Sequence, residues 1–185
     1  IVVTIFLIVT YKREVFKKIY VSGIPGLIGG IILGIGFSSY VFAMYNTTVA
    51  NTNFIIQTQT IFLAIFGFFF LKEKISKITL ASIILAISGL ILMLGNTLSS
   101  GQMSGNIVAF VMPITFATLI LIVRRYPHVD MVPLQLVAGI VAMIIGFLAS
   151  TKISISINDM FLAFLSGTFQ IGLGFILITI GARKT

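Results

Sequence analysis

Cysteine is absent from the 185 residues, and histidine occurs once. Without cysteine there is no disulfide, no thiolate metal site and no cysteine nucleophile. The single histidine has no evident co-ligands in its loop. The acidic and imidazole side chains of the whole chain are Glu14, Glu73, Asp130, Asp159 and His128. We therefore expect no cofactor and no metal.

Charge is scarce as well. Only 9% of the residues are charged, 58% are hydrophobic, and the mean hydropathy is +1.19. A soluble domain of this length could not cover so much apolar surface with so few charges, so the composition indicates a membrane protein. The net charge of +8 comes from basic clusters between apolar runs, not from one basic face. Positive loops at a membrane surface explain this pattern, and we expect no nucleic-acid partner.

Long apolar segments make up most of the chain. Each is near the roughly 20 residues that a spanning helix requires, which predicts an all-α membrane protein, a helical bundle. The first ten residues reach only about 15 Å at 1.5 Å per residue, too short to span. The six longer segments cover about 20–45, 52–71, 78–95, 105–123, 132–149 and 159–182.

Local signals mark some helix boundaries. Ser76 and Asn158 are candidate N-caps. Pro133 sits just inside the start of its helix, where its missing N–H costs little. Pro113 predicts a kink in the segment 105–123, which serves either to open a gap in the hydrogen-bond ladder or simply to improve packing.

The basic residues alternate from loop to loop. Eleven of the twelve lie in every second loop or terminus, and Lys152 alone lies in the others. By the positive-inside rule the basic loops face the cytoplasm, so we expect a multi-pass protein of the plasma (inner) membrane. The cytoplasmic loops are then 11–19, 72–77, 124–131 and 183–185.

A glycine pattern recurs along the chain. Four residues of GGIILGIGF and GTFQIGLGF match at an offset of 138: Gly29, Gly34, Gly36 and Phe37 with Gly167, Gly172, Gly174 and Phe175. Chance matching of glycine-rich helices is the alternative, but the same offset pairs a basic loop with a nearly uncharged one. Five helices separate the copies, an odd number, so the second copy is inverted. This predicts two repeats, 1–97 and 104–185.

The repeat also predicts what surrounds the chain. If the unit has five helices, one helix precedes residue 1 and two follow residue 185, and the chain is the interior of a ten-helix (5+5) protein. An intact mass that shows a native start at Ile1 and a native end at Thr185 would contradict this expectation.

The stretch Ala43–Leu94 resembles the EamA-type transporters of the drug/metabolite transporter superfamily. The resemblance rests on the turn Thr47-Thr48-Val49-Ala50, the helix end Leu71-Lys72-Glu73-Lys74, and Gly89 in the next helix. It implies a ten-helix transporter fold of two inverted five-helix repeats around a central cavity, with small metabolites as substrates.

Two positions depart from the pattern of that family. Thr60 stands where a proline is usual, which puts a kinked-helix mechanism at that point in doubt. Lys72 stands where a glycine usually precedes the glutamate.

Amides and threonines crowd the first half of the segment 52–71. Asn53, Gln57 and Thr60 follow i, i+4, i+7 and share one helix face. Unpaired amides in hydrocarbon cost about 4–8 kcal/mol each, so these side chains face protein or water. They line a substrate path between the repeats, or they are interhelical hydrogen-bonding groups; Asn51 and Asn53 could also lie in interfacial water.

Two further residues are candidates for the same path. Gln170 lies on the second glycine-rich segment, and Tyr40 could stack on a substrate. Tyrosines near helix ends are typically interfacial anchors, so Tyr40 has that alternative role.

These observations favour a secondary transporter of small polar metabolites, amino-acid-like or drug-like solutes, which we expect to work as an efflux carrier by alternating access. Its expected partners are a small-molecule substrate and the lipid bilayer, with a homodimer left open. The main alternative is a non-transporting membrane assembly subunit that packs partners through its glycine-rich helices. An enzyme is not expected, because no intramembrane acid, histidine or HExxH motif is present.

Overall fold

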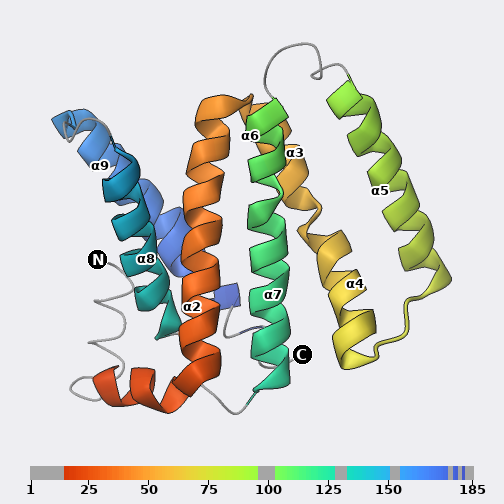
Figure 1. Cartoon of the computed structure of the whole chain (residues 1–185), viewed down its shortest axis with the longest axis horizontal. Helices are drawn as coiled ribbons and strands as arrows, with labels where there is room; N and C mark the ends of the chain where they lie inside the picture. Colours follow the sequence, from red (N-terminus) through yellow and green to blue (C-terminus); the bar gives the residue numbers. More distant parts are fainter. Residues whose placement is uncertain are drawn as a thin grey trace. The chain divides into compact units, whose positions relative to one another are not determined.

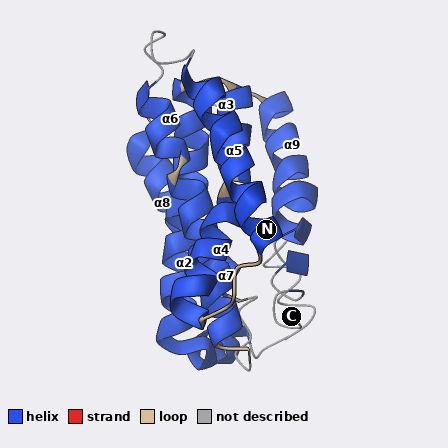
Figure 2. Ribbon diagram, turned by 90° about the vertical axis from the view of Figure 1, so that its right-hand side faces the viewer, coloured by secondary structure: helices blue, strands red, loops and turns tan. Residues whose placement is uncertain are grey.

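The computed structural model describes residues 15–95, 103–127, 133–150 and 155–174, together with 177, 178 and 181. Within these ranges all regular structure is helical and no strand occurs (Figure 2). The expected all-α class is confirmed. The apolar segment 1–10 lies outside the described residues.

Figure 1 shows the described helices in chain order. Three helical stretches are long and apolar enough to cross a membrane, Tyr20–Asn46, Val49–Leu71 and Met103–Arg125, so this is a multi-pass membrane protein. The described elements are α2 (Val15–Asn46), α3 (Val49–Gln57), α4 (Gln59–Leu71), α5 (Lys77–Gly95), α6 (Met103–Ala109), α7 (Val111–Arg125), α8 (Leu134–Ala149), α9 (Ile157–Leu165) and the π-helix η2 (Ser166–Leu173).

Side-chain caps set several helix starts. Ser76 Oγ accepts a hydrogen bond from Thr79 N at 3.1 Å, which confirms Ser76 as the cap of α5. Thr48 caps α3 in the same way through Asn51 N. The prediction of Asn158 as a cap was wrong: Ser156 is extended and caps α9 through Asp159 N at 3.1 Å. Serine and asparagine are equally good caps, so sequence alone could not choose between neighbours.

All three spanning stretches are interrupted. The first is kinked at Gly23 within α2, where φ is 59° and ψ is −156°. The kink expected from Pro113 is confirmed: α6 ends at Ala109 and α7 begins at Val111, because the proline has no N–H for the Ala109 carbonyl and its ring crowds that group. The interruption at Thr58, between α3 and α4, was not expected and occurs without a proline.

Contacts divide the chain into two compact units. The first comprises residues 1–34 and 122–185. Here the glycines of α2 pack on α8: a Cβ at Gly34 would lie 2.7 Å from Val141 Cβ and 2.8 Å from Ala138 O. A Cβ at Gly30 would likewise lie 2.8 Å from Leu134 O. Two helix backbones therefore approach closely, as small residues allow in membrane proteins.

The second unit comprises residues 35–121 and holds the rest of α2, α3 to α6 and most of α7. Its apolar centre is formed by Ala43, Ile55 and Ala109, all fully buried, with Leu90 and Phe110 packed against them. Four of the five candidate site residues belong to this unit.

Candidate functional site

Helix α3 carries polar side chains on two faces. Asn51 and Thr52 are 4% and 0% exposed, whereas Asn53 and Gln57 are exposed. Neighbouring amides on one short helix therefore have different surroundings.

The buried face joins α3 to α6. The Thr47 hydroxyl donates to Asn106 Oδ1 at 2.6 Å, and Asn51 Nδ2 lies 3.2 Å from Thr47 Oγ1 and 3.4 Å from Asn106 Oδ1. Asn106 is only 4% exposed. We call Thr47, Asn51 and Asn106 the asparagine cluster. Asn51 thus serves as an interhelical hydrogen-bonding group, one of the three roles considered for it.

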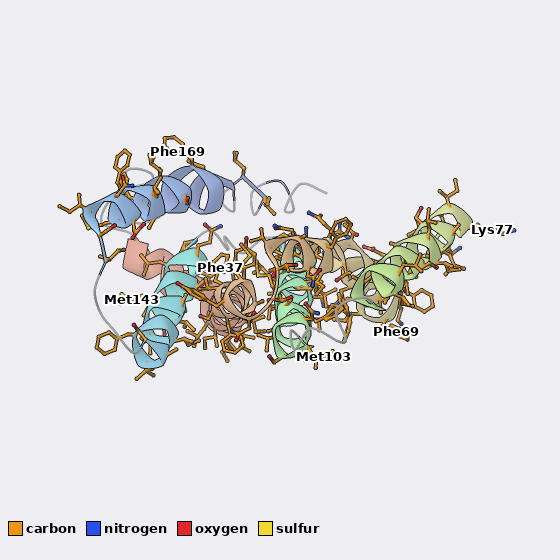
Figure 3. The ribbon with its side chains drawn as sticks, turned by 90° about the horizontal axis from the view of Figure 1, so that it is seen from above. Phe37, Phe69, Lys77, Met103, Met143 and Phe169 are labelled. Carbon is orange, nitrogen blue, oxygen red and sulfur yellow. The ribbon has the colours of Figure 1, made fainter. Side chains whose placement is uncertain are left out.

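A glycine beside the asparagine cluster permits this contact. A Cβ at Gly105 would lie 2.5 Å from both the carbonyl carbon and oxygen of Asn46, and 2.8 Å from Thr47 N. Only glycine lets the α6 backbone come this close to the turn between α2 and α3. Met103, labelled in Figure 3, begins α6 just before this contact.

The exposed face carries the candidate path residues. Asn53, Gln57 and Thr60 are all exposed, whereas Asn51, Ile55 and Ile61 are buried. Asn53 Nδ2 donates to Val49 O at 2.9 Å, within its own helix. These three side chains offer neutral donors and acceptors and no charge, a chemistry that suits uncharged or zwitterionic polar molecules.

The interruption at Thr58 lies within this exposed stripe. The Thr58 hydroxyl donates to Ile55 O at 2.6 Å, and Ile61 N turns to Thr58 O at 2.9 Å. The Thr60 hydroxyl donates to Gln57 O at 3.1 Å. Threonine hydroxyls that bond back to carbonyls one turn earlier bend helices and satisfy the carbonyls that the bend releases. The break therefore needs no proline at Thr60.

The other two candidate residues are not brought to this stripe. Tyr40 lies on α2 and is half-buried. Gln170 belongs to η2, but its side chain lies outside the described residues. Their part in a substrate path stays a prediction.

Comparison with protein families supplies the context for this geometry. A model of the EamA-like transporter family matches residues 1–95, half of the chain. The chain belongs to the EamA-like transporter family. Neither the curated proteins nor the solved structures that were searched gave a match.

The position of Lys72 in this EamA-like chain now has a physical explanation. Lys72 ends α4 in the left-handed conformation, with φ 57° and ψ 30°, and Glu73 N donates to Gly67 O at 3.1 Å. Glycine is the residue that adopts positive φ without strain, which accounts for the glycine usual at this position in the family.

Sequence reasoning missed Asn106 and Thr58. An asparagine at the start of the predicted segment 105–123 was a usable signal, because a buried amide in a membrane helix needs a partner. No such signal marked Thr58, since threonine is common in membrane helices without a break.

Proposed function

We propose that this EamA-like protein is a secondary carrier that exports small polar metabolites, amino-acid-like or drug-like solutes, across the plasma membrane by alternating access. The observation that carries the proposal is the stripe of Asn53, Gln57 and Thr60 on the exposed side of a spanning stretch. Gln170 and Tyr40 are proposed to join it.

Energetics support this role for the stripe. An amide that faced hydrocarbon would lose hydrogen bonds at a cost of several kcal/mol, so the stripe belongs against protein or a polar path. Inverted-repeat carriers bind their substrates near the membrane midplane, at discontinuous helices. Gln57 and Thr60 flank such a discontinuity at Thr58.

The charge of the path restricts the cargo. The stretches Tyr20–Asn46 and Val49–Leu71 contain no charged side chain. A solute with net charge would enter such a path without a counter-charge, at a large desolvation cost. We therefore propose uncharged or zwitterionic polar solutes as the substrates.

The alternative of an assembly subunit requires glycine faces that are free for partners. On α2 those faces are already used within the chain, since Gly30 and Gly34 lie against α8 and Gly36 against Thr115 of α7. The glycine face of α2 is therefore not free for a partner. A Cβ at Gly167 or Gly174 of the second glycine-rich segment would meet nothing within 4 Å, so the assembly subunit stays the alternative. The homodimer stays a prediction.

The primary test measures metabolites inside and outside cells that express the full-length gene product, against cells with an empty vector. We expect one class of uncharged or zwitterionic polar metabolite to move outward selectively. Absence of any shift across a broad panel, with the protein confirmed in the membrane, would reject the carrier and favour the assembly subunit.

A local test then addresses the stripe. Gln57→Leu removes an exposed amide, and we expect it to lower the transport rate by about tenfold, the effect of one lost hydrogen bond to the solute. Ser88→Leu on α5 is the matched control, because it also removes an exposed polar side chain. The Ser88 hydroxyl donates to Ile84 O of its own helix at 2.9 Å. Equal transport by both variants in folded protein would remove Gln57 from the path.

A further inference from the structure

We propose that the asparagine cluster is a releasable latch between α3 and α6. When it releases, the two half-helices part by bending at Thr58 and Phe110, while α4 and α7 stay in place. The inference rests on the proposed transport function for its purpose, but the geometry of the latch does not depend on the substrate.

The closed latch is defined by contacts of several kinds. Three hydrogen-bonding distances of 2.6 to 3.4 Å join Thr47, Asn51 and Asn106. Beside them, Gly105 brings the α6 backbone onto the turn between α2 and α3. Further along the two helices, Ile55 of α3 and Ala109 of α6 are fully buried in one apolar cluster. The contacting faces of the two half-helices are therefore buried.

Both half-helices end at a break soon after the latch. Thr58 follows Asn51 by seven residues and Phe110 follows Asn106 by four, which are rises of about 10 Å and 6 Å. Helices α3 and α6 start at the same end of this unit (Figure 1). The two breaks therefore lie at comparable depth, where a bend in each helix separates the latched halves.

Each break has already lost the hydrogen bonding of a regular α-helix. At the first, Thr58 N bonds to Ile55 O at 3.0 Å, one residue short of the α-helical partner. At the second, Phe110 N bonds to Ile107 O at 3.2 Å and Ile114 N to Phe110 O at a long 3.4 Å. Bending at these points breaks few good hydrogen bonds, as at other interruptions in helices.

Release of the latch also changes the polar stripe. Asn53 and Gln57 are on α3 and move with it, while Thr60 is on α4. The hydrogen bond from Thr60 Oγ1 to Gln57 O, 3.1 Å long, crosses the break. A swing of α3 therefore repositions two path residues against the third, which couples the latch to substrate binding.

The hydrogen bonds of the latch are weak enough for the latch to open and close reversibly. An interhelical hydrogen bond in a membrane protein shifts an equilibrium by about three- to tenfold. A cluster of this size favours the closed latch, while the binding energy of a solute can still shift the equilibrium to the released state.

The test measures the labelling rates of two single cysteines, which is straightforward because the chain has none of its own. Ala109→Cys reports on the contact between α3 and α6, and Ala117→Cys reports on α7, beyond the break at Phe110. Both alanines are fully buried. Each reporter is reacted with a small maleimide in the detergent-solubilised full-length protein, with any other cysteine replaced. The latch is weakened by Asn106→Ala and, separately, by Gly105→Ala. Gly89→Ala on α5 is the matched control, because its Cβ meets nothing within 4 Å.

We expect both latch variants to raise the labelling rate at position 109 by about three- to tenfold, with the rate at 117 unchanged and both rates unchanged in the control. Equal rises at 109 and 117 would mean general loosening and would overturn the latch. No rise at either position would overturn it too.

A second measurement covers variants that fail to fold. In a parent whose transport is established, Thr47→Cys with Asn106→Cys allows a reversible disulfide or short cross-link across the latch. We expect transport to stop when the link forms and to resume on reduction. Transport that continues with the link closed would show a static brace and reject the proposal. Labelling that reports a latch in a protein without transport would reject the proposed function alone.

Discussion

Two helix contacts, one in each compact unit, join helices in different ways. Between α2 and α8 the contact is made by backbone and methyl groups around Gly30 and Gly34. Between the α2–α3 turn and α6 it combines one glycine, Gly105, with the hydrogen bonds of the asparagine cluster. Both depend on glycine for close approach, but only the second has polar groups at its centre.

The difference indicates how readily each contact can separate. A close-packed contact loses dispersion along its whole length when it opens, and it gains nothing from a polar ligand. A hydrogen-bonded contact can exchange its partners for water or solute groups. We infer that the α2–α8 contact is the permanent one.

The largest expected effect tests the close-packed contact. Gly34→Val places side-chain atoms where Val141 and Ala138 already lie, and we expect it to lower the free energy of unfolding by about 2–3 kcal/mol. Thermal unfolding in detergent measures this. Gly139→Val on α8 is the control, because a Cβ there meets nothing within 4 Å, and we expect a much smaller change. Equal losses would mean that helix propensity, not close approach, sets the effect.

A smaller effect separates the two kinds of amide on α3. Asn51→Ala removes the donor to Thr47 and Asn106, and we expect a loss of about 1 kcal/mol in unfolding free energy. Asn53→Ala removes a bond within its own helix on the exposed face, and we expect a change within about 0.5 kcal/mol. The same unfolding assay compares them, and a greater loss for Asn53→Ala would contradict the assigned burial.

The smallest expected effect concerns a position where backbone conformation, and not a close contact, favours glycine. Gly34 and Gly105 are required by space, whereas Lys72 occupies a left-handed position without a glycine. We expect Lys72→Gly to stabilise the protein by about 0.5–1 kcal/mol, because glycine adopts this φ without strain. Lys74→Gly in the same loop is the control. A decrease in unfolding temperature for Lys72→Gly would show that its side chain matters more than its φ.

Parts of this architecture could be predicted from particular residues. Pro113 predicted the break in its segment, since proline cannot donate to the helix ladder. Asn53, Gln57 and Thr60 were expected on one helix face by the helical period. All three are exposed, and their part in a substrate path stays a prediction. The turn at Thr47 and the helix end at Leu71 pointed to the family that the match over residues 1–95 confirms.

Other features could not be predicted in this way. The break at Thr58 depends on hydroxyl bonds to nearby carbonyls, which most membrane threonines make without a break. The positive φ of Lys72 arises because this residue is the left-handed C-cap of α4. Lysine has no preference for this conformation, so its side chain could not predict it.

Hydropathy and helical period act locally along the chain, so the amino-acid order was enough to predict a helical membrane protein and the course of its apolar segments. Only the tertiary structure decided which amides are buried: Asn51 and Asn53 are the same residue type two positions apart, and what separates them is Asn106, more than fifty residues away. The partner of a buried polar group is a matter of packing between helices, which no local pattern contains.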